Sequence, residues 1–219
     1  MDVLSNTATA AAFERVLSWV AHCTEKHNEC HLPNPDFIPR RLINVRSGDT
    51  EPFLFEPQQP CSYVALSYCW GVDISDVPVT TSARLDPYSS AIQLLTLPQT
   101  ICDAIAFCRG IQAQYLWVNM LCIIQDNESD WATESSKMHL IYSNSFLTLA
   151  VHRPVSCFEG FLGEQSYGQE QWQKAFQATQ KIPRSDLWLG VGNLYVRTAE
   201  AEPPAWRSSA LKIRGWTLH

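Results

Sequence analysis

Two groups of aromatic and polar residues in this 219-residue chain have side chains suited to ligand binding or catalysis. The first group lies at the end of the apolar run YVALSYC and contains Ser67, Tyr68, Trp70 and Gly71. Aromatic rings stack on flat ligands, and hydroxyl and indole groups supply hydrogen bonds. The first group therefore has the composition of a binding wall for a flat ring.

The second group lies within and after the apolar run YLWVNMLCII and contains Asn119, Gln125, Asp126, Trp131 and Glu134. Glu134 falls in the stripe 131, 134, 138, 141, which otherwise reads Trp, Met and Ile and has the spacing of a core-facing helix. A carboxylate sheltered in this way could act as a base or stabilise a developing cation. The competing interpretation is that the aromatic residues belong to the core and that Glu134 lies at the half-exposed edge of the stripe.

Cys23, His27 and Cys30 are weaker candidates, in this case for a zinc site, because zinc prefers cysteine and histidine ligands. Their spacing is not that of a standard zinc finger, and a fourth ligand would have to come from His22 or His31. The same three residues continue the apolar stripe of a predicted helix, so we expect no metal there. The sequence contains no Gly-x-Ser-x-Gly elbow, Gly-x-Gly-x-x-Gly motif or phosphate loop.

Strands that alternate with helices must position these residues. Strand, helix, strand, helix and strand over residues 63–151 predict an α/β fold with a parallel sheet and right-handed crossovers. Ligands bind such sheets beyond the carboxyl ends of the strands, so we expect both groups to face one crevice. The predicted elements are a helix over 9–30, a hairpin of 40–45 and 51–56, a strand over 63–69, a helix from a Thr96–Gln99 capping box to about Arg109, a strand over 115–124, a helix capped by Ser129 or Asp130 and ending near Tyr142, and a strand over 146–151.

Composition narrows the class of protein. Apolar residues make up 46% of the chain and charged residues 17%, which is enough to bury a sizeable core. The net charge is −6 and no basic run stands out, so we expect no nucleic-acid partner. The sequence contains no stretch of 18 apolar residues, so it predicts no membrane span. The eight cysteines are scattered, several of them in apolar runs, which favours reduced thiols and a cytoplasmic location.

Together the motifs form a series in a fixed order. The series is Trp19 with Cys23-x3-His27-x2-Cys30, RLINV, YVALSYCWG, LPQTICDAI, YLWVNMLCIIQD, DWATESSKMHLIYSNS and a closing RGWT. This series resembles the fungal heterokaryon incompatibility (HET) domain, and the resemblance covers most of the chain. It implies an N-terminal helix and hairpin extension over 1–60, followed by a HET-like domain over 61–219.

The resemblance also implies fold and function. HET domains look like distant relatives of TIR domains, which have flavodoxin-like α/β folds with a parallel sheet flanked by helices. Family members act in non-self recognition and programmed cell death, which implies homotypic self-association or a partner of the HET or NLR type. Many TIR domains cleave NAD with a helix glutamate, so the resemblance implies NAD as a substrate and Glu134 as the catalytic acid beside Trp131. A further alternative is a HET-like chain recruited to small-molecule metabolism.

The chain departs from the family pattern at three places. Asn119 stands where the family usually has aspartate, and Ser145 stands where it usually has alanine. The closing motif continues in the family into Gln-Glu, whereas this chain stops at His219. We therefore expect a domain shortened at its C-terminus, and one that lacks any role of the missing aspartate.

Overall fold

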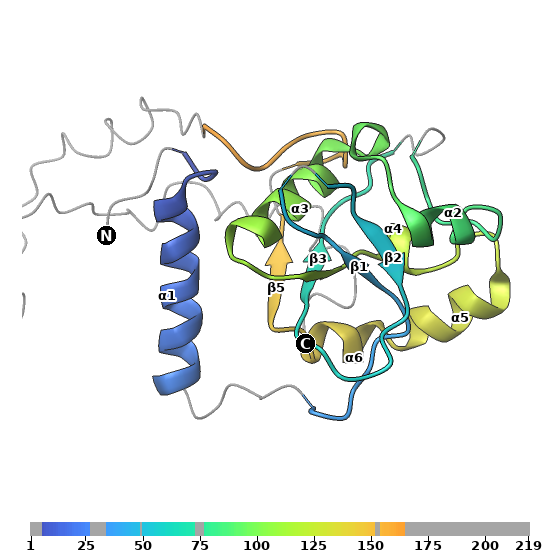
Figure 1. Cartoon of the computed structure of the whole chain (residues 1–219), viewed down its shortest axis with the longest axis horizontal. Helices are drawn as coiled ribbons and strands as arrows, with labels where there is room; N and C mark the ends of the chain where they lie inside the picture. The colour runs from blue at the N-terminus through green and yellow to red at the C-terminus, as the bar shows by residue number, and fades with distance from the viewer. Residues whose placement is uncertain (1–5, 27–33, 49, 73–76, 152–153, 165–219) are drawn as a thin grey trace, which may run out of the picture.

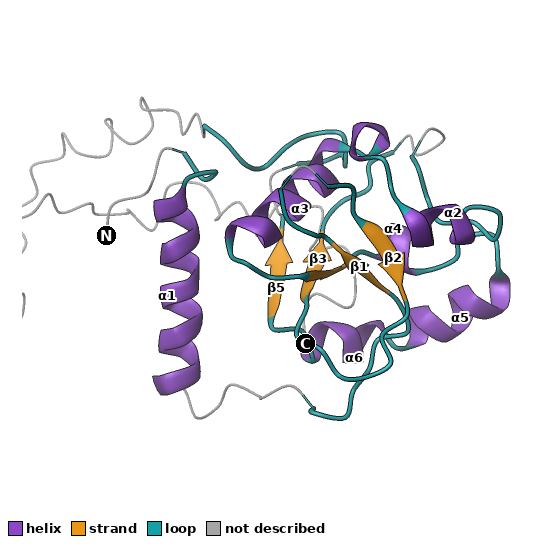
Figure 2. Cartoon of the chain, in the orientation of Figure 1, coloured by secondary structure: helices purple, strands orange, loops and turns teal. Residues whose placement is uncertain are grey.

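A five-stranded mixed sheet forms the centre of the protein. The structure is a computed structural model that describes residues 6–26, 34–48, 50–72, 77–151 and 154–164. The predicted α/β fold is confirmed: helices surround the sheet, and the first helix stands at the side of the body (Figures 1 and 2). The sheet order is β2-β1-β4-β3-β5. The strands are β1 (Leu42–Asn44), β2 (Phe53–Phe55), β3 (Val64–Ser67), β4 (Tyr115–Trp117) and β5 (Leu147–Ala150).

The helices include two long ones and several short ones. They are α1 (Ala10–Lys26), α2 (Leu85–Ser90), the 3-10 turn η1 (Leu94–Thr96), α3 (Gln99–Gly110), α4 (Asn119–Cys122), α5 (Glu128–Ser136) and α6 (Met138–Ser143). Helix α3 buries the apolar stripe that its sequence predicts, including Ile101, Ala104, Ile105 and Cys108. None of the described helices is both long and apolar enough to span a bilayer.

The parallel part of the sheet consists of β4, β3 and β5. Val64 in the central strand β3 is in register with Leu116 on one side and Leu147 on the other. All four residues of β3 are buried. A parallel strand covered on both faces is expected to be apolar along its whole length, which is why the run YVALS predicted it.

The hairpin of β1 and β2 belongs to the same sheet. Ile43 in β1 is in antiparallel register with Leu54 in β2 and also with Leu116 in β4. The predicted hairpin is therefore confirmed, and it extends the parallel strands into a mixed sheet. The strands that precede residue 60 and those that follow it therefore belong to one sheet.

The strand predicted over 115–124 is too long. Strand β4 ends at Trp117, and the residues from Asn119 to Cys122 form the short helix α4. Met120, Leu121 and Cys122 are all buried. An apolar run with no polar interruption is buried equally well as a strand or as a helix, so its periodicity cannot decide between them.

Two predicted caps are also wrong. Thr96 lies in η1 and donates to the carbonyl of Gln93, and Pro98 occupies the N-cap position of α3 with no side-chain cap. Helix α5 is capped by Asn127, whose side chain accepts from the N–H of Asp130 at 3.0 Å. The carboxylate of Asp130 instead forms an ion pair with Arg41.

Candidate functional site

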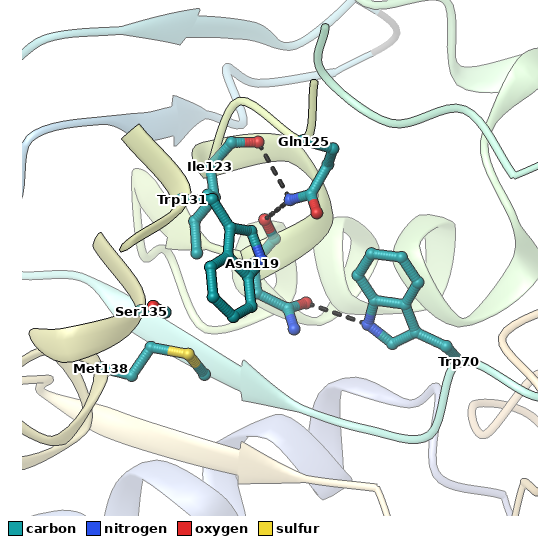
Figure 3. A pocket seen from close by; sticks show the side chains of 7 residues that line it. All are labelled: Trp70, Asn119, Ile123, Gln125, Trp131, Ser135 and Met138. Carbon is teal, nitrogen blue, oxygen red and sulfur yellow. Dashed lines mark hydrogen bonds between the residues drawn. The ribbon is translucent and has the colours of Figure 1, made fainter. Parts of the chain in front are cut away.

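A cavity of about 410 Å³ lies beyond the carboxyl ends of β3 and β4 (Figure 3). Trp70 follows β3 by three residues, and Asn119 follows β4 by two. This is where an open parallel sheet presents its loops to ligands. Seven residues line the cavity: Trp70, Asn119, Ile123, Gln125, Trp131, Ser135 and Met138.

Four of these lining residues belong to the two groups predicted from the sequence. The structure thus brings Trp70 from the first group together with Asn119, Gln125 and Trp131 from the second. The sequence reasoning missed Ile123, Ser135 and Met138. A signal existed for two of them, since Ser135 and Met138 lie four and seven residues after Trp131 and so share its helical face.

The side chain of Asn119 has a fixed orientation. Its Oδ1 accepts from the indole Nε1 of Trp70 at 3.2 Å and from the backbone N–H of Met120 at 2.9 Å. Two donors at one atom identify that atom as the oxygen. The Nδ2 group, which has no hydrogen-bond partner among the described residues, remains available at the cavity wall.

The side-chain amide of Gln125 is also fixed, but through its nitrogen and not through its oxygen. Its Nε2 donates to the backbone carbonyls of Asn119 and Ile123, each at 3.1 Å. Two carbonyl acceptors identify the bonded atom as the nitrogen. The free atom is therefore Oε1, an acceptor that makes no hydrogen bond within the described part of the chain.

Trp131 supplies an accessible ring. Its side chain is 52% exposed although it lines the cavity, because α5 carries it at the rim. Figure 3 shows the side chain of Asn119 between the indoles of Trp70 and Trp131, with the side chain of Gln125 above them in this view. Trp70 is half-buried and tied to Asn119, so one ring is fixed and the other is open to solvent.

The remaining predicted ligand-binding residues lie elsewhere. Ser67 and Tyr68 are buried in and after β3. Gly71 adopts φ +100°, and a Cβ placed there would lie 3.0 Å from Oγ of Ser156. Asp126 is exposed, and its Oδ1 accepts from the N–H and hydroxyl of Ser82. None of these four is a lining residue of the cavity.

Glu134 is buried on α5 with only 2% of its surface exposed, but it does not line the cavity. Burial raises the pKa of its carboxyl above the usual value, although the charge of Lys137 offsets part of this increase. Lys137 Nζ lies 3.8 Å from Oε1, which is an ion pair and not a hydrogen bond. Glu134 is thus a sheltered acid on the helix that forms one cavity wall.

A buried ion pair that the sequence did not indicate lies at the start of the same helix. Arg41 is 1% exposed, and it donates from both terminal nitrogens to Asp130 and from Nη1 to the carbonyl of Cys122 at 2.8 Å. Arg40 Nη1 lies 2.8 Å from Asp130 Oδ1. Burial alone raises the pKa of Asp130, but hydrogen bonds from Arg41 and from the Ile124 N–H bring it below its usual value.

The weak zinc candidates do not form a site in the described part of the chain. Cys23 is half-buried on α1, and His27 and Cys30 lie outside the described residues. No group of three or more histidine, cysteine, aspartate or glutamate side chains in the described ranges is arranged to hold a metal ion.

Comparison with known families decides the identity. A family model described as heterokaryon incompatibility protein (HET) matches residues 63–219. The chain belongs to the HET family. No curated protein and no solved structure matches it. The HET match begins just before β3, so β1 and β2 precede the matched region although they complete its sheet.

Proposed function

We propose that this HET domain is a signalling module of fungal non-self recognition, in which self-association in the cytoplasm triggers cell death. The observation that carries the proposal is the family match over residues 63–219. Exposed apolar side chains on α1 support an interaction role. Phe13 packs edge-on against Phe107 of α3 with ring centroids 6.0 Å apart, while Leu17 and Trp19 remain 37% and 53% exposed. Contiguous apolar patches mark interaction surfaces, and Trp19 is the most exposed large apolar side chain that α1 could contribute to one.

Light scattering after size-exclusion chromatography tests self-association. We expect the full chain to associate as its concentration rises, and Trp19→Ser to weaken that association. Trp131→Ser is the matched control, because Trp131 has a similar exposed fraction and lies at the cavity. Expression of the chain in a filamentous fungus, scored for cell death, tests the signal. A chain that stays monomeric at every concentration and leaves growth unchanged would overturn the proposal.

A second function, NAD cleavage, is favoured by the cavity with its two tryptophans. In this reaction the bond between nicotinamide and ribose breaks and water adds to the ribose, which releases nicotinamide, ADP-ribose and a proton. Glu134 would stabilise the oxocarbenium-like transition state. Since Glu134 does not line the cavity, this role requires α5 to turn its buried face toward the ligand.

Chromatographic detection of nicotinamide tests this second function. We expect release from NAD by the wild-type chain and loss of release in Glu134→Gln with the fold retained. Absence of release by the wild-type chain, or equal release by both proteins, would remove Glu134 from any such mechanism. Because self-association and nicotinamide release are measured separately, the two functions stand or fall independently.

A further inference from the structure

We propose that the cavity between Trp70 and Trp131 recognises a flat ring that carries a cis amide edge, which is either a primary carboxamide or a ring lactam. Such an edge presents a carbonyl acceptor and an N–H donor side by side. This inference deepens the assignment of the cavity as a binding site, and it requires only that the ligand binds, with or without turnover. It therefore holds whether or not the chain cleaves NAD.

The cavity wall presents the complementary pair of groups. Asn119 offers the Nδ2 donor, because its Oδ1 is occupied by Trp70 and Met120. Gln125 offers the Oε1 acceptor, because its Nε2 is occupied by two backbone carbonyls. Neither amide can turn over without losing two hydrogen bonds, so the order of donor and acceptor is set before a ligand arrives.

The two amides also act as one unit. Gln125 Nε2 donates to the backbone carbonyl of Asn119 itself, which ties the two side chains to the same loop. A ligand carbonyl would accept from Asn119 Nδ2 while the neighbouring ligand N–H donates to Gln125 Oε1. Paired hydrogen bonds of this kind read both the identity and the orientation of an amide.

The rest of the lining favours a flat and uncharged ligand. None of the seven lining side chains is ionisable, so a carboxylate, phosphate or ammonium group placed inside the cavity would lose its hydration without finding a counter-charge. A ligand that also carries phosphates, such as NAD, would have to keep them outside the cavity. The two indoles provide the stacking surfaces. A cavity of about 410 Å³ lies within the range of small-molecule sites and admits a mono- or bicyclic ring with a substituent.

Four small probes test the inference on the full chain by tryptophan fluorescence and by ligand-observed NMR. Benzamide presents a primary carboxamide, and hypoxanthine presents a ring lactam. Benzoate replaces the amide with two acceptors, and benzamidine replaces it with two donors. We expect benzamide or hypoxanthine to bind at least about tenfold more tightly than both benzoate and benzamidine. The tighter of the two amides identifies which edge the cavity reads.

Asn119→Asp is the decisive variant. Aspartate keeps the oxygen that accepts from Trp70 and Met120, but it replaces the Nδ2 donor with a second, charged acceptor. We expect benzamide binding to weaken about tenfold and the preference to reverse toward benzamidine. A substitution that only destabilised the fold would lower the affinity of all four probes together and would not reverse the order of their affinities.

Asn127→Asp is the matched control. It introduces the same charge at a residue outside the cavity lining, and its oxygen still accepts from the Asp130 N–H that caps α5. We expect it to bind the four probes as the wild-type chain does. The inference is overturned if neither amide binds, if benzoate or benzamidine binds the wild-type chain as well as the amides do, or if Asn119→Asp leaves the order of affinities unchanged.

Discussion

Replacement of Asp130 by asparagine should destabilise the fold strongly. Asp130 is 5% exposed and receives the guanidinium of Arg41, one nitrogen of Arg40 and the N–H of Ile124. Asparagine keeps the shape of the side chain but removes the negative charge. It also places an NH2 group against one of those donors, which leaves a donor facing a donor.

The magnitude follows from the burial of Arg41. Removal of one partner of a buried ion pair typically costs about 3–5 kcal/mol, because the other charge stays buried without compensation. Glu56 lies 3.6 Å from Arg41 Nε and is 57% exposed at its side chain, so it neutralises Arg41 only partly. We therefore expect the free energy of unfolding to fall by about 3 kcal/mol. This is a large share of the total, which is about 5–15 kcal/mol for an ordinary domain.

Urea denaturation followed by tryptophan fluorescence measures this loss. Asp126→Asn is the matched control, because Asp126 is exposed and asparagine retains the oxygen that accepts from Ser82. The control should change the free energy of unfolding by less than about 0.5 kcal/mol. If Asp130→Asn stayed within about 1 kcal/mol of the wild-type chain, the buried pair with Arg41 would not hold α5 in place.

Three further substitutions give predictions of different kinds. Burial raises the folded pKa of Glu134, so its neutral form is favoured in the native state. The stability from this group is fully present below the unfolded pKa and is lost as pH rises through the folded pKa. Glu134→Gln removes the titrating group, so urea titrations at several pH values should show a flatter loss of stability with rising pH. Trp70→Phe keeps an aromatic ring but frees Oδ1 of Asn119, so benzamide and benzamidine should bind with equal affinity in the NMR assay; a retained preference would show that Met120 alone orients the amide. Gly110→Ala places a Cβ against the ring of Phe13, so it should cost about 1 kcal/mol and make α1 cleave faster in limited proteolysis, whereas an unchanged cleavage rate would show that α1 does not depend on this contact.

Much of the fold was predictable because its strands are short, apolar and bounded by turn residues. The runs that became β1, β2, β3 and β5 were each found within two residues of their ends. Strand β4 was not, because Met120, Leu121 and Cys122 are buried in helix α4 and their pattern resembles a continuing strand. Whether this segment forms a strand or a helix depends on the residues that pack around it, and its own sequence does not identify those residues.

The candidate site was partly predictable for a related reason. Trp70, Asn119, Gln125 and Trp131 follow the ends of parallel strands, and topology alone brings such residues to one edge. Whether a side chain points into the cavity depends on helical phase, which separated Glu134 from Trp131 although both lie on α5. The role of Asp130 was hidden because its partner Arg41 is distant in sequence and becomes a neighbour only when β1 joins the sheet.

The boundary of the family match has a practical meaning for anyone who isolates this domain. A fragment beginning at residue 63 would lack β1, and the backbone groups that Ile43 and Asn44 now satisfy along Leu116 and Tyr115 would be bare. It would also lack Arg41, so Asp130 would be left without its main counter-charge. An exposed strand edge of this kind pairs readily with other copies of itself. Aggregation of the truncated fragment could therefore be mistaken for the homotypic assembly proposed for the intact protein.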